Sequence, residues 1–315
     1  MSVFKINISK TSNGNMYINW MSGDWLEKFI EYQFPDKKQK ITFISVDGRR
    51  PCLDNDNSKK IFFSGENLEP NISHKNVRND YLNIRYYWFN MRKNLYKDYL
   101  LDEADLSLGY ANKNYGNYLR FPLWIMYLFD PRSKYSDIKA KVLEINKSKN
   151  LALKDFICIN RHDLFGLRTK ICNDLGNKFT ITYAGKWRNN TNELWENYDN
   201  DKLRYLNLFK FNICPENMDA PYYCTEKLFD ALRCGCIPIY AGCLNNPEPE
   251  IINKDFVIFW DLDGDNAEQI KLVSRLYNDE DYYQKFINQP KLKANVADYI
   301  AEYFEHLQTK LKDLI

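Results

Sequence analysis

The stretch YYCTEKLFDALRCGCIPIYAG, residues 222–242, has a charged start and an apolar remainder. Leu228 and Leu232 lie one helical turn apart, as on the buried face of a helix. Gly235 then provides a typical helix end, and Ile237–Tyr240 has the uniformly apolar character of a buried strand. The stretch therefore predicts a helix followed directly by a strand, which is the repeating element of an α/β sheet.

The same alternation extends over the rest of the chain. Further strands are expected at residues 3–8, 40–46, 59–63, 106–110, 156–160, 180–183, 210–214 and 256–260. Further helices are expected at 25–32, 167–175, 267–277 and 297–314, and the charged run 131–154 is expected to be a helix or a linker. This rhythm predicts two Rossmann-like α/β domains that face each other across a cleft, with ligands at the carboxyl ends of the strands.

The composition is that of an ordinary globular protein, and its small net charge creates no strong electrostatic field around the whole molecule. Its 315 residues are 44% hydrophobic and 27% charged, which suits two compact domains or one large one. The 44 basic and 42 acidic residues leave a net charge of +2, so any anion site must be local. Nucleic acid is therefore not an expected partner.

The cysteines and the N-terminus indicate a reduced, cytoplasmic protein. Eight cysteines show no disulfide or zinc-finger spacing, and neither a secretory signal nor an apolar run of 18 residues occurs. The helix expected at 297–314 carries an apolar stripe and should dock on its own protein. A peripheral contact of this helix with the inner membrane or with a partner is the alternative.

The charged helix start is the first candidate site. Thr225 is expected as N-cap, so that the amides of the first turn and the helix dipole favour an anion such as phosphate. Lys227 adds a full positive charge, whereas Glu226 would repel phosphate and must face sugar hydroxyls or a developing cation. Local spacing alone leaves the alternative that Glu226 complements the helix dipole and Lys227 is solvated.

The residues before this helix favour the first alternative. Glu216-Asn217 ends a strand, and the whole sequence KFNICPEN…YYCTEKLFDALRCGCIPIYAG resembles the donor-binding signature of the α1,3-fucosyltransferases, glycosyltransferase family 10. That signature has a Lys/Arg-Phe-x-x-x-x-Glu-Asn segment, then Tyr-x-Thr-Glu-Lys, an apolar helix and Pro-Ile-Tyr-x-Gly. The match spans more than 30 residues with coherent spacing.

Other segments resemble the same family in the same order. Phe62-Phe-Ser-Gly-Glu66-Asn67 is similar to its acceptor-side loop, residues 105–110 and 117–122 to the segment after that loop, and Leu167-Arg168 to its phosphate-contacting arginine. The resemblance covers roughly residues 60–265. The first 55 residues share only the strand–helix rhythm, and the heptad-like C-terminal repeats of some bacterial members are missing.

The resemblance implies a GT-B-like fold and a fucosyl transfer. Residues 1–150 would form the acceptor-binding domain, 151–290 the GDP-fucose-binding domain and 291–315 a C-terminal helix. L-Fucose would pass with inversion from GDP-fucose to a hydroxyl of a GlcNAc-containing or N-acetyllactosamine-type acceptor, in α1,3 or α1,4 linkage and without a cofactor. Another GDP-sugar, or sugar binding without catalysis, remains the alternative.

The resemblance also implies roles for single residues. Inversion in one displacement needs one base for the acceptor proton, and Glu66 is the expected base, with Glu69 as the fallback in the same loop. Arg168 and Lys227 would stabilise the leaving diphosphate. Glu226 would lie on the fucosyl side and stabilise oxocarbenium character.

Three further residues are expected to bind the donor. Asn217 and Tyr223 match positions that contact the diphosphate or the ribose, and Lys186 follows the strand expected at 180–183. The acids of Asp261-Leu-Asp263-Gly-Asp265 resemble a metal-binding D-x-D motif, but they are expected to form a strand-end loop without a metal. Of the three histidines, His162 is expected near the nucleotide, and His74 and His306 at the surface.

Overall fold

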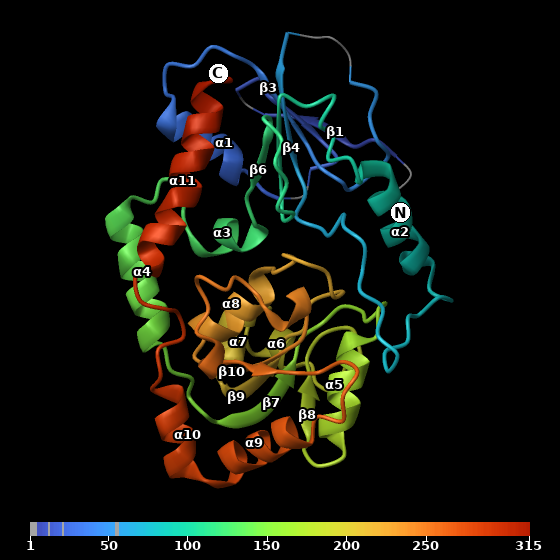
Figure 1. Ribbon diagram of the computed structural model, residues 1–315, viewed down its shortest axis with the longest axis vertical. Coiled ribbons are helices and arrows are strands. Elements are labelled where there is room, and N and C mark those ends of the chain that lie inside the picture. The colour runs from blue at the N-terminus through green and yellow to red at the C-terminus, as the bar shows by residue number, and fades with distance from the viewer. Residues whose placement is uncertain (1–4, 12, 21, 54–56) are drawn as a thin grey trace. The chain divides into compact units, whose positions relative to one another are not determined.

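The structure is a computed structural model that describes residues 5–11, 13–20, 22–53 and 57–315 (Figure 1). The chain divides into two compact units. The first unit comprises Met1–Pro70, Leu82–Ile138 and Ala297–Ile315, and the second comprises Asn71–Tyr81 and Lys139–Val296.

These units do not coincide with the expected domain boundaries. The charged run in which the boundary was expected, near residue 150, forms helix α4 (Tyr135–Lys147), and the units divide within this helix. At its start, the Tyr135 hydroxyl donates to the Asp298 carboxylate of the first unit at 2.6 Å. Near its end, the Asn146 side chain accepts from the amide of Leu292 in the second unit at 2.8 Å. The two ends of α4 therefore belong to different units.

The first unit is built on a six-stranded sheet. Its order is β1-β2-β3-β4-β5-β6, with β1 and β2 antiparallel and the other pairs parallel. The strands are Ile8–Lys10, Met16–Ile18, Ile41–Ile44, Lys59–Phe63, Leu106–Gly109 and Tyr118–Arg120. Among the described strands the order follows the chain without reversal. The strand expected at 3–8 lies partly outside the described residues.

Helices α1 (Trp25–Gln33), α2 (Ile84–Tyr96), α3 (Leu123–Leu128) and α11 (Val296–Lys312) accompany this sheet. The apolar stripe of α11 docks on the first unit, as expected: the Phe304 ring lies 5.8 Å from the Trp25 ring and 6.1 Å from the Phe29 ring. Leu307 and Leu311 are fully buried. The C-terminal helix is thus part of the core of the first unit, because its apolar side chains are buried against the aromatic rings of α1.

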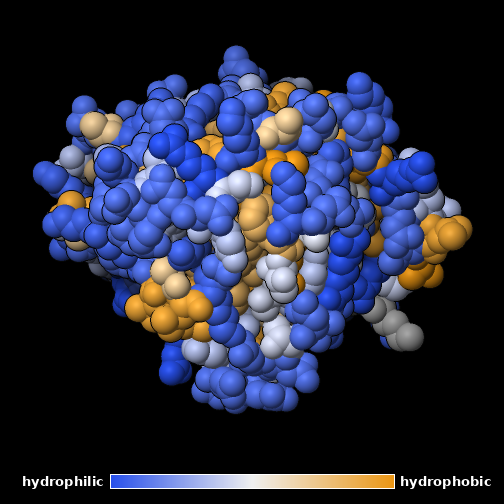
Figure 2. Space-filling model, turned by 90° about the horizontal axis from the view of Figure 1, so that it is seen from below, coloured by the Kyte–Doolittle hydropathy of each residue, from blue (hydrophilic) through white to orange (hydrophobic). Residues whose placement is uncertain are grey.

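No helix in the described part of the chain is long and apolar enough to cross a bilayer. The face shown in Figure 2 is mainly hydrophilic and carries several separate hydrophobic patches.

Replacing Phe304 by alanine should lower the free energy of unfolding by about 3–5 kcal/mol, because a buried aromatic ring is lost and a cavity remains. Urea unfolding followed by circular dichroism measures the change. Glu305→Ala, at the exposed neighbouring position, is the control and should change stability by less than about 0.5 kcal/mol. Equal effects of the two substitutions would contradict the docking of α11.

The second unit has a fully parallel five-stranded sheet of order β11-β10-β9-β7-β8. In chain order its strands are Lys154–Cys158, Ile181–Tyr183, Phe209–Ile213, Ile237–Tyr240 and Ile258–Phe259. The chain starts at β7, adds β8 on one side and then crosses to β9 on the other. This is the flavodoxin-like order, in which the connections reverse direction between β7 and β9. Both units are therefore α/β, as predicted.

Seven helices lie in or extend into the second unit: α4, α5 (Leu167–Gly176), α6 (Glu193–Glu196), α7 (Lys202–Leu206), α8 (Glu226–Arg233), α9 (Ala267–Asn278) and α10 (Glu280–Ile287). Short 3-10 turns occupy Cys243–Asn245 and Lys254–Phe256. Sequence analysis does not anticipate α6 and α7, which are only four and five residues long, nor α2, α3, α10, β2 and β6. Seven of the eight cysteines are buried and all are free.

Lys291 is an unusual residue in the core of the second unit. It is fully buried, and its ammonium group lies 4.8 Å from the Phe256 ring centroid with no hydrogen-bond partner among the described residues. Burial, and secondarily the charge of Lys149, lowers the pKa of Lys291 from 10.5 to about 8. The folded chain therefore holds this proton less tightly than the unfolded chain does.

This difference predicts how stability depends on pH. Below pH 8 Lys291 is protonated in both the folded and the unfolded chain, and its burial destabilises the fold to the full extent. As the pH rises from 8 to 10.5 this destabilisation disappears, so the free energy of unfolding increases across that window. Lys291→Met should raise the free energy of unfolding at pH 7 by up to about 3 kcal/mol and flatten its pH dependence. Unfolding at pH 7, 8 and 9 tests this, with exposed Lys293→Met as control; a destabilised Lys291→Met protein would contradict it.

Candidate donor site

The strand order of the second sheet locates the candidate site. In parallel sheets ligands bind at the carboxyl ends of the strands, where the connections reverse direction. Here that point lies after β7 and β9, whose following loops are residues 159–166 and 214–225. Glu216, Asn217 and the start of α8 all belong to the second of these loops or follow it directly. Topology alone thus indicates the region that the charged motif occupies.

Arg168 lies in the first turn of α5 and is 1% exposed. Its guanidinium donates to the His162 carbonyl and to the Asn217 side-chain oxygen, both at 2.7 Å. The Asp163 carboxylate is 3.9 Å away and accepts from the Thr169 amide at 2.6 Å, so it caps the helix. The structure therefore joins the predicted residues Arg168 and Asn217, and the loops after β7 and β9, through one buried cation.

This cation retains unused donor capacity. A guanidinium carries five N–H donors, and the buried Nε of Arg168 has no hydrogen-bond partner among the described residues. Gly166 precedes the helix at a φ of 77°, and a Cβ there would lie 2.5 Å from the Arg78 carbonyl oxygen. Only glycine fits this close approach, which sets the direction of α5 and hence of Arg168.

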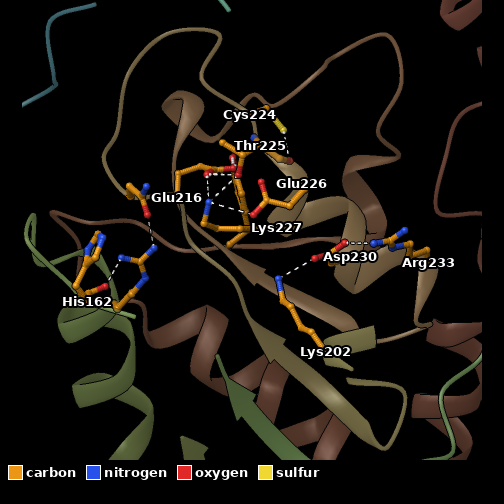
Figure 3. Close-up of polar contacts among 12 residues, drawn as sticks. His162, Lys202, Glu216, Cys224, Thr225, Glu226, Lys227, Asp230 and Arg233 are labelled. Carbon is orange, nitrogen blue, oxygen red and sulfur yellow. Dashed lines mark hydrogen bonds and ion pairs between the residues drawn. The ribbon is translucent and has the colours of Figure 1, made fainter. Parts of the chain in front are cut away.

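Glu216 organises the start of α8 (Figure 3). Its carboxylate is fully buried and accepts from the Thr225 amide at 2.8 Å, the Thr225 hydroxyl at 2.7 Å, and both the Lys227 ammonium and the Tyr240 hydroxyl at 3.3 Å. Gly242 makes room for it, since a Cβ there would lie 2.8 Å from Cγ of Glu216. Four donors from the α8 start and β10 thus converge on one carboxylate at the end of β9.

Thr225 occupies the N-cap position, as expected, but its side chain does not cap the helix. The hydroxyl instead donates to Glu216 and accepts from the Lys227 ammonium at 2.8 Å. The Thr225 side chain therefore does not cap the first-turn amides of α8.

Glu226 and Lys227 form an ion pair with a shortest distance of 3.6 Å. Desolvation opposes ionisation of Glu226, but Lys227 and then Lys202 outweigh it and hold the pKa of Glu226 below its ordinary value. Lys202 is in turn held by Asp230 at 2.7 Å (Figure 3). Glu226 is therefore a carboxylate, not a proton donor, at neutral pH.

The two other donor-binding candidates have different environments. Lys186 is exposed in the loop after β8, and this loop lies against the loop after β7, because a Cβ on Gly185 would be 2.1 Å from the Asn160 carbonyl oxygen. Tyr223 is 1% exposed and belongs to the core of the second unit. Lys186 is thus accessible, whereas Tyr223 is held by packing.

Glu66 and Glu69 lie in the first unit, in the loop after β4. The Glu66 carboxylate is 30% exposed and lies 3.5 Å from the Arg92 guanidinium. The Glu69 carboxylate lies 2.9 Å from the Lys113 ammonium and accepts from the Tyr99 hydroxyl, also at 2.9 Å. Both expected base candidates are therefore at the carboxyl end of a parallel strand.

The expectation that His74 is a surface residue is wrong. Its side chain is 13% exposed, and its two ring nitrogens lie 3.0 Å from carboxylate oxygens of Asp219 and Asp263. The segment 71–81 packs on the second unit, where the Asn76 side chain donates to the Asp263 carbonyl at 2.7 Å. His306 is exposed, as expected. His74 is covered because the fold brings it to Asp219 and Asp263, which lie far from it in the sequence.

The acids of the former D-x-D candidate have local roles. The Asp263 carboxylate binds His74, the Asp261 carboxylate accepts from the Asp263 amide at 2.9 Å, and the Asp265 carboxylate accepts from the Ala267 amide at 3.1 Å. No group of three or more His, Cys, Asp or Glu residues suited to a metal occurs in the described parts of the chain.

Two residues that organise the site, Glu216 and Asp163, are not among the predicted catalytic or donor-binding residues, although Glu216 belongs to the quoted signature. Both act on other residues of the site: Glu216 holds Thr225 and Lys227, and Asp163 caps the helix of Arg168. For Asp163 the available signal was an acid five residues before Arg168 at a predicted helix start. For Glu216 no local pattern predicts burial, because its partners come from α8 and β10.

Comparison with known proteins gives the family. The family model described as "Glycosyltransferase family 10 (fucosyltransferase) C-term" matches residues 147–308, slightly more than half of the chain. The chain belongs to glycosyltransferase family 10. The matched part of this family 10 chain includes Arg168, Asn217, Glu226 and Lys227.

Relatives of this family 10 chain carry fucosyltransferase names. The Alpha-(1,3)-fucosyltransferase FucT of Helicobacter pylori is 26% identical over 290 residues, which are 89% of this chain and 56% of that protein. The chain thus spans little more than half of that relative's length.

Solved structures show the same fold. One crystal structure of an α1,3-fucosyltransferase has a TM-score of 0.57 at 18% identity, covering 92% of this chain and 88% of the other. A second, titled as the complex with GDP-fucose, has a TM-score of 0.50 at 18% identity, covering 87% and 79%. These likenesses confirm the GT-B-like fold class.

The Glu216 network predicts a stability change. Glu216→Gln replaces a fourfold acceptor by a neutral amide, so it should lower the free energy of unfolding by about 1–3 kcal/mol through unsatisfied buried donors. Thermal unfolding measures this, and Glu250→Gln, at an exposed position of the same unit, is the control. An unchanged midpoint for Glu216→Gln would show that the network does not hold α8.

Proposed function

We propose that this chain is an inverting fucosyltransferase that moves L-fucose from GDP-fucose to a hydroxyl of a GlcNAc-containing acceptor. The observation that carries the proposal is the buried Arg168–Asn217 contact at the reversal point of the second sheet. Family 10 membership supports it, as do the fucosyltransferase names of its relatives. The second unit would bind the donor and the first unit the acceptor.

The donor half provides positive charge for a diphosphate. Arg168 has donor capacity left over, Lys227 lies in the first turn of α8, and the positive end of the α8 dipole lies at that same turn. The negative charge on GDP grows as the bond to fucose breaks, so these groups stabilise the leaving group without a cofactor. Lys186, being exposed, and Asn217 would add contacts to the diphosphate or ribose, and Tyr223 would support them from the core.

Glu226 would lie on the fucosyl side of the same helix start. Its lowered pKa keeps it ionised, so it can accept hydrogen bonds from fucose hydroxyls and stabilise positive charge at the anomeric carbon. Its repulsion of the diphosphate is reduced by the ion pair with Lys227. The adjacent acid and base thus divide their roles between sugar and phosphate.

Glu66 would be the general base. In the transfer, the acceptor oxygen forms a bond to the anomeric carbon, the carbon–phosphate oxygen bond breaks with its electron pair going to GDP, and the acceptor proton moves to the Glu66 carboxylate. Glu69 is less suited, because its carboxylate is bound by both Lys113 and the Tyr99 hydroxyl. We also propose that the acceptor is of the N-acetyllactosamine type and that the protein works in the cytoplasm or at the inner membrane surface.

Incubation with GDP-fucose and N-acetyllactosamine, with and without EDTA, tests the activity. We expect release of GDP and a fucosylated product in both conditions, because Arg168 and Lys227 supply the charge that a metal would otherwise provide. If no GDP-sugar released GDP, the proposal that the chain is an enzyme would be refuted. If only a GDP-sugar other than GDP-fucose released GDP, the proposed donor would be wrong. Loss of activity with EDTA would refute the metal-free mechanism.

Two substitutions separate the proposed roles. Glu66→Gln should reduce kcat at least 100-fold, since a general base contributes about 10²–10⁴-fold, and should leave the Kd of GDP unchanged. Lys227→Ala should weaken GDP binding by about tenfold or more, because a charge-assisted contact is lost. Calorimetric titration with GDP and steady-state kinetics measure both, and near-normal turnover of Glu66→Gln would exclude it as the base.

A further inference from the structure

Two similar ion pairs hold the loop that carries Glu66 and Glu69. Arg92 contacts Glu66 at 3.5 Å and Lys113 contacts Glu69 at 2.9 Å. Each cation also lies over an aromatic ring: Arg92 is 4.5 Å from the Phe89 ring centroid and Lys113 is 4.8 Å from that of Tyr99. All of these residues belong to the first unit.

Arg92 is fixed by its own helix. It follows Phe89 by three residues on α2, so the guanidinium stacks on a ring of the same helical face. The start of α2 is capped, since the Asn83 side chain accepts from the Arg85 amide at 3.1 Å. The Arg92 side chain is 14% exposed, about half as much as that of Glu66. A loop carboxylate thus faces a cation that is held on a regular helix.

The two glutamates differ in what else holds them. The Glu69 carboxylate accepts the hydrogen bond of Tyr99, which is 1% exposed, and Asn67 stabilises the local turn by accepting from the Glu69 amide at 2.9 Å. Ser64 stabilises the turn at Glu66 in the same way: its hydroxyl accepts from the Glu66 amide at 3.3 Å and donates to the Glu66 carbonyl at 2.8 Å. Glu69 is therefore anchored to the buried Tyr99, and the Glu66 carboxylate lies against the Arg92 guanidinium.

We propose that Arg92 is a positioning residue that orients the Glu66 carboxylate for proton abstraction. The proposal rests on the proposed function of Glu66 as general base. The benefit expected from Arg92 is geometric. A base must reach the acceptor hydroxyl at hydrogen-bond distance, and a misplacement of about 1 Å can cost about 100-fold in rate.

The test is a pair of matched substitutions. Arg92→Met keeps an unbranched apolar stem over Phe89 and removes the guanidinium. It should lower kcat about 10- to 100-fold, with the KM for GDP-fucose and the unfolding midpoint unchanged. Arg92→Lys, which keeps the charge without the planar group, should recover part of the loss. A fall in stability that matched the fall in kcat would overturn the proposal in favour of a purely structural role.

Lys113→Met is the control, because it removes the equivalent cation from Glu69. It should leave kcat within about twofold, as expected for a partly exposed ion pair of small net effect. The opposite result, loss in Lys113→Met and none in Arg92→Met, would overturn the role of Arg92 and assign the base to Glu69.

A double substitution separates this proposal from the proposed function. If Arg92 acts through Glu66, Arg92→Met should have no further effect on kcat in a Glu66→Gln protein, so that the two losses are not additive. Additive losses would overturn the role of Arg92 and leave Glu66 as the base. Normal turnover of Glu66→Gln itself would refute the proposed function of Glu66, whatever the effect of Arg92→Met.

Discussion

The candidate donor site depends on one buried carboxylate, that of Glu216. A charge without access to water is stable only when donors surround it, and here the donors come from the start of α8 and from β10. Glu216 therefore fixes where α8 begins and where the Lys227 ammonium lies. The Glu216 carboxylate also requires a glycine at position 242, because any side chain there would displace it.

The strand order of the second sheet adds a constraint that no single contact provides. Because the chain crosses from β8 to β9 on the opposite side of β7, the loops after β7 and β9 diverge at the carboxyl edge. Arg168 from the first loop region meets Asn217 from the second at this point. The first sheet follows chain order and, in its described strands, has no such reversal. In it the charged loop after β4 holds the candidate base.

The two acids of the loop after β4 pair with cations in different surroundings. Lys113 and Tyr99 tie Glu69 to the core, which resembles the way in which Glu216 is held. Arg92 contacts Glu66 from α2, where its guanidinium stacks on the Phe89 ring. One short loop thus carries an acid tied to a buried tyrosine and a second acid, the candidate base, that pairs with an arginine.

Much of the fold and part of the site could be predicted from the sequence, because periodic apolar spacing and glycine positions are local properties. The helix and strand of residues 226–240, the strand at 59–63 and the roles of Gly235 and Leu228 follow from such local rules. Only the tertiary structure decided the burial of Glu216, the pairing of His74 with Asp219 and Asp263, and the docking of α11 in the first unit, since these depend on partners that are distant in the chain.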